Sequence, residues 1–269
     1  MATYHFVTIR LPYRRLHLFA VTAPARRFPR RALPAKTSAP KALILVAAEL
    51  EAEILFGTPR HRASWLDVCV AGVGTGGDGA ARQAIDATAA ELVVNPGFAG
   101  GLSAAARPGS CFTVTRWVGL ERANLHREVP PGLVDKLAPL AIRPATAMTV
   151  DLPVGDPESR RELAATGADL VEMEGARWAL AAFRRGLPFV SLRVISDCAD
   201  DALARPRHEL LTATGSVRWA RWLRATAGSD HGWLEALTRL RGAQRDWRLA
   251  CASLRTVGAA ITAWQRDTS

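Results

Sequence analysis

Short apolar runs alternate with helical segments from residue 41 to residue 204, and this alternation constrains the fold more than any other feature. The apolar runs are rich in Val, Ile and Leu, which is typical of buried β-strands. Strands that alternate with helices form βαβ units, so the pattern predicts an α/β fold: a three-layer sandwich around a central, mostly parallel (mixed) β-sheet. The predicted strands are 43–47, 67–71, 92–95, 111–118, 145–150, 169–173 and 188–195, and the predicted helices are 49–56, 78–90, 157–166 and 174–185.

The net charge of +10 is unevenly distributed along the 269 residues. Residues 1–40 carry 8 basic and no acidic side chains, and residues 205–269 carry 11 basic and 5 acidic ones. Residues 41–204, in contrast, carry 16 basic and 20 acidic side chains. A nucleic-acid-binding domain needs a basic patch or stripe on its folded surface. The mildly acidic middle of the chain therefore predicts that there is no specific nucleic-acid partner.

These differences in charge along the chain predict three regions. We expect a basic, flexible N-terminal extension over 1–40, a globular core over 41–204 and a basic helical region over 205–269. Five of the eight Trp residues lie in the last region, where apolar residues recur at helical spacing and most Arg residues lie off the apolar stripe. We expect this amphipathic region to pack on the core, with contact to a membrane surface as the alternative.

Cysteine usage and hydropathy bear on the compartment. The four Cys residues form no CxxC pair, and none has a His at metal-ligand spacing, so the sequence predicts a reduced compartment and no metal site. No apolar run approaches the roughly 18 residues that a membrane-spanning helix needs. We therefore expect a cytoplasmic protein, with peripheral contact to the inner face of the membrane as an alternative.

Two Gly-rich segments follow predicted strands. Residues 72–77 read GVGTGG and match the GxGxxG pattern of dinucleotide-binding proteins. This strand is not the first of the predicted sheet, however, and the next one ends in Asn95 where a ribose-binding carboxylate would be expected. We therefore predict no nicotinamide cofactor, and instead a tight turn that holds a helix N-terminus open for substrate. The second segment, 97–101, is predicted to be a loop.

Carboxylates gather at the predicted carboxyl ends of the strands, where ligands bind in α/β sheets. Two of them follow the first strand, two more flank Met173, and three follow the strand 188–195. Cleavage of a glycosidic bond uses two carboxyl groups, one at the leaving group and one at the nucleophile. The pattern therefore predicts a site for this chemistry. The carboxylates are Glu49, Glu51, Glu172, Glu174, Asp197, Asp200 and Asp201.

Four sequence blocks, in this order, resemble the superfamily of purine nucleoside phosphorylases and 5′-methylthioadenosine/S-adenosylhomocysteine nucleosidases. The blocks are ILVAAELEAE (44–53), VVNPGFAGGL (93–102) followed by RPG (107–109), VEMEGA (171–176) and RVISDCAD (193–200). The resemblance covers 41–204, and it implies an enzyme with the nucleoside phosphorylase fold that cleaves the N-ribosidic bond of a purine nucleoside derivative. The nucleosidase branch, which releases adenine, is the preferred reading.

The resemblance also implies roles for individual residues. Asp197 matches the acid that protonates or hydrogen-bonds N7 of the departing purine, which removes charge where it accumulates. Glu174 matches the carboxylate that grips the ribose hydroxyls, and Met173 packs on the sugar. Glu51 matches the glutamate that activates water. The remaining candidates for substrate contact are Glu172, Gly97, Phe98, Ala99 and Ser196.

Two departures from the family pattern affect the predicted reaction. Phe98 stands where the nucleosidases usually have Ser or Thr, and an aromatic ring there adds a face for stacking. Phosphorylases place an Arg-containing phosphate loop after the first strand, but Glu49 and Glu51 follow it here and would repel phosphate. Hydrolysis is therefore preferred over phosphorolysis, although Arg60 and Arg62 remain candidate phosphate ligands. No cofactor is expected, and phosphate is a co-substrate only if the protein is a phosphorylase.

Three alternative functions remain open. The apolar residue in the Gly-rich block and the Arg- and Trp-rich C-terminal region resemble the hopanoid-associated branch, which implies a phosphorylase acting on a lipid-linked nucleoside such as adenosylhopane. A futalosine hydrolase is the second alternative, and a catalytically silent nucleoside-binding or membrane-docked module is the third. Relatives are oligomeric, so the resemblance implies a homo-oligomer, either a dimer or a trimer, with a small-molecule nucleoside as ligand.

Overall fold

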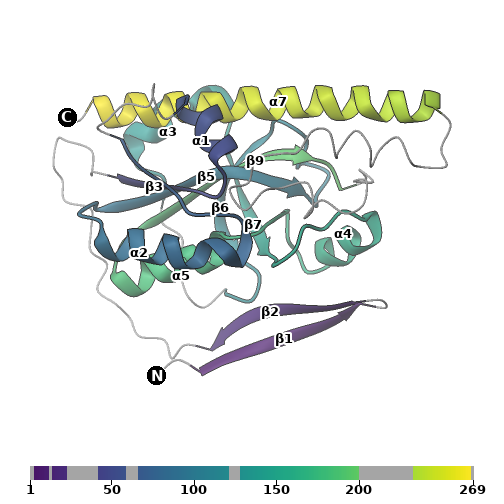
Figure 1. Ribbon diagram of the computed structural model, residues 1–269, viewed down its shortest axis with the longest axis horizontal. Helices are drawn as coiled ribbons and strands as arrows, with labels where there is room; N and C mark the ends of the chain where they lie inside the picture. The colour runs from purple at the N-terminus through teal and green to yellow at the C-terminus, as the bar shows by residue number, and fades with distance from the viewer. Residues whose placement is uncertain are drawn as a thin grey trace.

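The computed structural model describes residues 3–11, 14–22, 42–58, 66–120, 128–199 and 233–267. For 3–11, 14–22 and 233–244 the description is restricted to the backbone. Within this part of the chain, one sheet of seven strands forms the centre of the molecule (Figure 1). Its strands are β3 (Ala42–Val46), β4 (Asp67–Val70), β5 (Leu92–Gly101), β6 (Cys111–Trp117), β7 (Arg143–Thr149), β8 (Leu170–Glu172) and β9 (Phe189–Asp197).

The sheet is mixed, and part of it closes on itself. Strands β4, β3, β5 and β9 run parallel to one another, as do β6, β7 and β8. The two groups meet through antiparallel pairs, β6 with β9 and β8 with the end of β5. Because β5 pairs with both β8 and β9, these five strands (β5, β8, β7, β6 and β9) form a ring. The predicted mostly parallel, mixed sheet is confirmed.

Helices cover both faces of the sheet and give the predicted three layers (Figure 1). One face carries α1 (Glu49–Phe56), α3 (Pro131–Leu137) and α7 (Trp233–Arg266), and the other carries α2 (Asp78–Ala87) and α5 (Gly175–Arg185). Shorter elements are α4 (Pro157–Ala164) and the 3₁₀ turns η1 (Gly74–Gly77) and η2 (Ala138–Leu140). Helix α3 was not predicted from the sequence.

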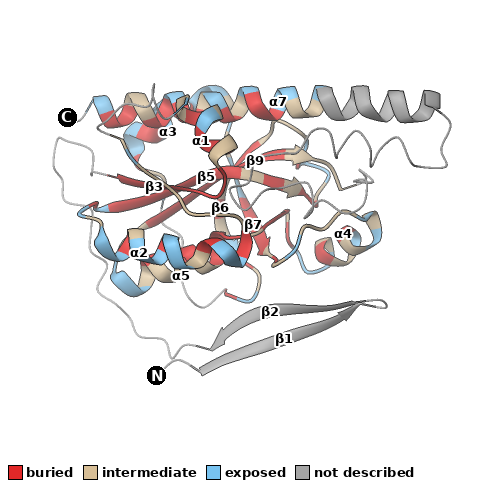
Figure 2. Cartoon of the chain, viewed as in Figure 1, coloured by how far each residue is buried: buried red, intermediate tan, exposed pale blue. Residues whose placement is uncertain are grey.

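An apolar core lies on each face of the sheet, and this explains why the central strands are apolar throughout. In β3, Leu43 and Leu45 pack on the α2/α5 side, whereas Ile44 and Val46 pack on the α1/α7 side. Successive side chains of a strand point to opposite faces, so a strand covered on both faces must be apolar throughout. Figure 2 shows this burial along the central strands.

Local signals set the helix ends beside the site. Helix α1 begins after Ala48, whose backbone N–H donates to the side chain of Glu51 in the first turn. Helix α4 begins at Pro157, and the carboxylate of the preceding Asp156 accepts the N–H of Ser159 at 2.7 Å. Helix α5 ends at Gly186, whose φ of 77° is in the left-handed region. Each helix thus starts or stops where its residues satisfy the terminal backbone groups.

The second Gly-rich segment, predicted to be a loop at 97–101, is instead the second half of β5. It continues as a strand because it pairs with β9 as far as Asp197, and β9 likewise extends past the predicted end at 195. Glycines are required here because neighbours approach closely. A Cβ atom added to Gly101 would lie 2.3 Å from the carbonyl oxygen of Ala106. The prediction was wrong because Gly can mark close approach as well as a turn.

The C-terminal helix α7 packs on α1 and on the sheet. Leu254, Val257 and Ile261 are fully buried against this face. Gly258 allows the close approach, because a Cβ atom added there would lie 2.0 Å from the carbonyl oxygen of Leu55 in α1. Among the residues that the structure describes, no helix is both long and apolar enough to cross a bilayer.

Two strands lie within residues 1–40, which were predicted to be a flexible extension without strands. They are β1 (Thr3–Leu11) and β2 (Arg14–Thr22), which pair antiparallel from Thr3 opposite Thr22 to Leu11 opposite Arg14. The segments are rich in Thr, Val, Ile, Leu and aromatic residues, which favour strands. The rest of the predicted extension lies outside the described residues, as does the first part of the predicted C-terminal region, 205–232.

Candidate active site

Glu51 lies in the first turn of α1 and is held by three backbone N–H groups. One carboxylate oxygen, Oε2, accepts the N–H groups of Ala47 and Ala48 at 3.1 Å each, and Oε1 accepts the N–H of Phe98 at 2.8 Å. Burial raises the pKa of Glu51 above its ordinary value, although these hydrogen bonds and the charge of Arg193 act in the opposite direction. The carboxylate therefore joins the start of α1 to β5 and is a stronger base than an exposed one.

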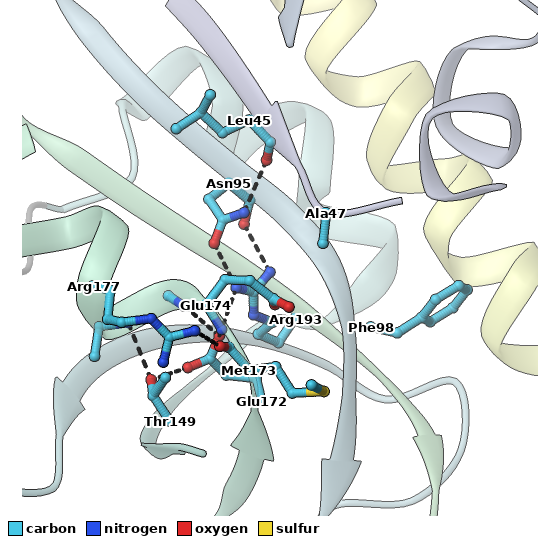
Figure 3. Close-up of polar contacts among 12 residues, drawn as sticks. Leu45, Ala47, Asn95, Phe98, Thr149, Glu172, Met173, Glu174, Arg177 and Arg193 are labelled. Carbon is cyan, nitrogen blue, oxygen red and sulfur yellow. Dashed lines mark hydrogen bonds and ion pairs between the residues drawn. The ribbon is translucent and has the colours of Figure 1, made fainter. Parts of the chain in front are cut away.

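The segment Glu172-Met173-Glu174 forms the junction between β8 and α5. The Glu172 carboxylate accepts the N–H groups of Glu174 and Gly175, the hydroxyl of Thr149, and an N–H of Arg193 (Figure 3). It is 4% exposed. Glu172 was predicted to contact substrate, but these partners occupy its two oxygens. The structure places it beneath the site, where it fixes the backbone that presents Glu174.

Arg193 is buried at the centre of β9 and connects three strands (Figure 3). Its Nη2 atom donates to Oε2 of Glu172 at 3.0 Å and to the side-chain oxygen of Asn95, and Nη1 donates to the Asn95 carbonyl at 3.3 Å. Asn95 Nδ2 in turn donates to the Leu45 carbonyl at 2.8 Å. Neither Arg193 nor Asn95 was predicted to have a role in the site. A usable signal was present, because an Arg inside the apolar strand FVSLRVIS must have a buried partner.

Glu174 is the second buried carboxyl group with a raised pKa. Its Oε1 atom accepts the N–H of Gly74 at 2.6 Å, and the side chain is 7% exposed. Burial raises the pKa of Glu174 to about 8, with help from the neighbouring charges of Glu172 and Glu51 and against the Gly74 N–H and Arg193. At neutral pH this carboxyl is therefore largely protonated in the free protein.

The GVGTGG segment contacts this carboxyl group through its backbone. Gly72 and Gly74 have φ values of 115° and 64°, which fits the predicted tight turn. A Cβ atom added to Gly74 would lie 3.2 Å from the methyl group of Met173. The turn therefore lies directly against Met173 and Glu174, and it presents the backbone N–H of Gly74 to the carboxyl group of Glu174.

Asp197 ends strand β9 and has two side-chain partners. Its Oδ2 atom forms an ion pair with Arg160 of α4, and Oδ1 accepts the hydroxyl of Ser196. The Asp197 side chain is 17% exposed, whereas that of Arg160 is 2% exposed. No role was predicted for Arg160, which lies 37 residues from Asp197 in the chain.

Phe98 contributes its backbone, not its ring, to the carboxylate cluster. Its N–H donates to Glu51, while its ring packs on Trp247 of α7 with the ring centroids 4.9 Å apart. Figure 3 shows the ring directed toward the C-terminal helix and away from Glu174. The ring was predicted to offer a face for stacking, but that face is turned to Trp247. Ala99 is buried, and its carbonyl oxygen lies 3.3 Å from the Ser196 hydroxyl.

The structure brings together Glu51, Glu172 and Glu174 around one buried cation, Arg193. Gly97 lies at the centre, since a Cβ atom added there would be 2.8 Å from Glu51 Oε1 and 2.9 Å from Arg193 Nη1. Asp197 lies beside Gly100, about 10 Å further along β5 at about 3.3 Å per residue. Among the described residues, no group of His, Cys, Asp and Glu is arranged to hold a metal ion. Four predicted candidates, Arg60, Arg62, Asp200 and Asp201, lie outside the described residues.

A match to a family profile shows which protein family the chain belongs to. The family profile described as the phosphorylase superfamily matches residues 60–220, more than half of the chain. The chain belongs to the phosphorylase superfamily. The match includes Glu174 and Asp197 but begins after Glu51. This membership confirms the predicted relationship and the prediction of an enzyme in the class of N-glycosyl hydrolases and nucleoside phosphorylases. No curated protein matches the sequence.

Solved structures confirm the fold of this superfamily member. The 5′-methylthioadenosine/S-adenosylhomocysteine nucleosidase from Neisseria meningitidis, in complex with methylthio-immucillin-A, is 19% identical with a TM-score of 0.52, over 82% of this chain and 98% of that one. The futalosine hydrolase of Helicobacter pylori is 15% identical with a TM-score of 0.53, over 83% and 96%. The Helicobacter pylori nucleosidase with butyl-thio-DADMe-immucillin-A is 17% identical with a TM-score of 0.54, over 83% and 96%.

Proposed function

We propose that this superfamily member hydrolyses the N-ribosidic bond of a purine nucleoside derivative and releases adenine. The observation that carries the proposal is the pair of buried carboxyl groups, Glu51 and Glu174, both with raised pKa and both held by backbone N–H groups. Titratable groups with perturbed pKa values gather at catalytic sites. The names of the similar structures, nucleosidases and a futalosine hydrolase, support the same class of reaction.

The charge of the cluster suits the transition state of this reaction. Cleavage of an N-ribosidic bond passes through an oxocarbenium-like sugar, which carries positive charge. Glu51, Glu172 and Glu174 surround a single buried cation, Arg193, whose charge is directed to Glu172. Because Glu172 is paired with Arg193 and Glu174 is largely protonated at neutral pH, the Glu51 carboxylate is the group that stabilises the developing positive charge in this buried site.

Each proposed catalytic group has a separate task. Glu51, as a carboxylate with a raised pKa, takes a proton from the attacking water. Glu174 binds the ribose hydroxyls, and Met173 packs against the sugar. The departing base takes a proton from solvent at N7 as the bond to the sugar breaks, and the Asp197 carboxylate at the end of β9 accepts the hydrogen bond of that N7–H group. These tasks are proposals for this chain.

Hydrolysis is preferred over phosphorolysis because the Glu51 carboxylate occupies a group of backbone N–H donors that could otherwise bind an anion. The backbone N–H groups of Ala47, Ala48 and Phe98 converge as an anion-binding site would, but the Glu51 carboxylate already accepts all of them. A phosphate ion at this position would meet a second negative charge. Water meets no such repulsion.

The substrate and the co-substrate can be tested together. The protein is incubated with methylthioadenosine, S-adenosylhomocysteine, adenosine, inosine and futalosine, with and without phosphate, and the free base is measured by liquid chromatography. We expect adenine release without phosphate. Release that requires phosphate would overturn the hydrolase proposal, and absence of release from every compound would favour a silent binding module. Base release from futalosine alone would favour the futalosine hydrolase alternative, which the similarity to the Helicobacter pylori enzyme supports.

The role of Asp197 is tested by Asp197→Asn, which keeps the size of the side chain. The amide still accepts a hydrogen bond from Arg160, so we expect a folded protein by circular dichroism. Base release is expected to fall by about 10²–10⁴-fold, the typical contribution of a positioned acid–base group. Wild-type kcat in this variant would contradict the assignment.

A further inference from the structure

Arg160 is a buried cation that has no task in the proposed reaction. It lies in α4, and its side chain is 2% exposed, whereas the next residue, Arg161, is exposed on the same helix. Its Nε atom donates to the Val154 carbonyl at 3.0 Å, Nη1 donates to the Cys198 carbonyl, and Nη2 donates to Oδ2 of Asp197. The guanidinium therefore ties the segment before α4 to the end of β9.

The environment of this ion pair differs on its two sides. Arg160 is enclosed, but the Asp197 side chain is 17% exposed. One carboxylate oxygen faces Arg160 and the other accepts the Ser196 hydroxyl. Each carboxylate oxygen can accept two hydrogen bonds, so Asp197 still has acceptor capacity for a ligand. The Asp197 carboxylate is thus held in place by Arg160 and Ser196, and its exposed part is accessible to a ligand.

We infer that Arg160 is a positioning residue that holds the Asp197 carboxylate in place for its contact with the departing base. The inference rests on the proposed function of Asp197. A free Asp side chain rotates about two bonds, and the ion pair with Arg160 together with the Ser196 hydrogen bond restricts both rotations. A displacement of about 1 Å in a catalytic group can reduce the rate about 10²-fold, so fixing this side chain has a kinetic effect.

The shape of the guanidinium matters as well as its charge. It donates in three directions at once, to Val154, Cys198 and Asp197. A Lys ammonium is a point charge on a single atom and does not reach all three acceptors as the planar fork does. Lys at this position would therefore keep the ion pair with Asp197 but lose part of the alignment.

The experiment compares Arg160→Met and Arg160→Lys with Arg161→Met, a matched control on the same helix. Circular dichroism and thermal unfolding establish that each variant is folded, and base release is measured on the substrate that the wild type turns over. We expect kcat to fall about 10²-fold in Arg160→Met with KM changed by less than about threefold, and a smaller fall in Arg160→Lys. Arg161→Met is expected to behave as wild type.

A double-mutant cycle separates positioning from a general structural role. Arg160→Met is also made in the Asp197→Asn background, where we expect no further fall in kcat because the group to be positioned is already inactive. An equal fall in both backgrounds, or an unchanged kcat in Arg160→Met, would overturn this inference alone. No base release by the wild type would instead overturn the proposed function on which it rests.

If Arg160→Met does not fold, Gly100→Ala tests the same contact without removing a charge. A Cβ atom added to Gly100 would lie 3.2 Å from Cγ1 of Val171, 3.3 Å from Arg160 Nη2 and 3.4 Å from Asp197 Oδ2, so it would press on the ion pair as well as on the Val171 side chain. The same fall in kcat with little change in KM is expected. Unchanged kinetics in both Gly100→Ala and Arg160→Lys would overturn the inference.

Discussion

Single residues of the carboxylate cluster serve structure and chemistry together. Glu51 accepts the N–H groups that begin α1 and one N–H of β5, and it is also the proposed base. Glu174 receives one backbone N–H, from Gly74, and is the proposed ribose ligand. Because Glu51 has more hydrogen bonds to lose, substitutions of these two residues should differ in their effect on stability.

For Glu51→Gln we expect losses in both stability and activity. The Gln amide group would direct N–H donors at backbone N–H groups, so at least one buried donor loses its partner and stability falls by about 1–3 kcal/mol. Base release is expected to fall by about 10²–10⁴-fold through loss of the base. Urea denaturation and a base-release assay measure the two effects. The control is Glu53→Gln, an exposed position on the same helix; equal behaviour of the two variants would contradict the assignment.

The raised pKa of Glu174 predicts a pH-dependent stability. An unfolded Glu titrates near 4.5, whereas the folded group titrates at about 8. Between these values the folded protein binds more protons at Glu174 than the unfolded chain does, so the free energy of unfolding falls as pH rises from about 4.5 to about 8. Urea denaturation across this range should show a shallower decline for Glu174→Gln than for the wild type. Exposed Glu158→Gln is the control, and parallel curves for wild type and Glu174→Gln would refute the prediction.

At the scale of elements, α7 supports the site without supplying a proposed catalytic group. It packs on α1, which carries Glu51, and its Trp247 packs on Phe98, whose N–H holds Glu51. Both contacts converge on the same carboxylate. The position of the proposed base therefore depends on a helix that comes nearly 200 residues later in the chain.

Gly258→Ala tests this dependence. The added Cβ atom would lie 2.0 Å from the Leu55 carbonyl oxygen, and backbone must move to relieve the overlap. We expect a loss of about 1–3 kcal/mol in stability, as for other overpacked interiors, and a fall in base release because α1 shifts. Thermal unfolding and the base-release assay provide the measurements. Ala259→Ser, one position along on the exposed face, should change neither, and a wild-type result for Gly258→Ala would rule out the tight contact.

At the scale of the whole molecule, positive charge and proposed chemistry occupy different parts of the chain. The proposed catalytic and binding residues lie between Glu51 and Asp197, in the region that is mildly acidic. The excess of basic side chains lies in 1–40 and 205–269. The net charge of +10 therefore bears on what these outer segments contact and not on the bond that is cleaved.

Removal of residues 1–40 should leave base release at the wild-type rate, because the hydrogen bonds described for Glu51, Glu174 and Asp197 all lie within residues 41–204. The same variant should lose retention on an anionic resin at low salt, since 8 basic side chains are removed. Chromatography and the base-release assay measure the two properties. A large fall in base release would show that the N-terminal segment contributes to the site.

Most elements near the site could be predicted from the sequence, because apolar periodicity and caps are local signals. The strand ends of β5 and β9 could not, since Gly97 and Gly100 are typical of a loop and become strand only when β9 pairs beside them. Asp197, Glu174 and Glu51 stood out as carboxylates at strand ends within recognisable motifs. The ion pairs Glu172–Arg193 and Asp197–Arg160 were not predicted. An Arg inside the apolar strand β9 signals that a buried partner exists, but partners 21 or 37 residues apart leave no local pattern that identifies the pair.

The sequence by itself determined the alternation of strands and helices, the apolar faces and the motif residues, since each depends on side chains close together in the chain. Only the tertiary structure decided what each carboxylate faces. It assigned Glu172 to the backbone and Arg193, turned the Phe98 ring to Trp247, and paired Asp197 with Arg160. The physical reason is that burial and long-range pairing set the charge state and direction of a carboxyl group, and both arise only when distant segments pack together.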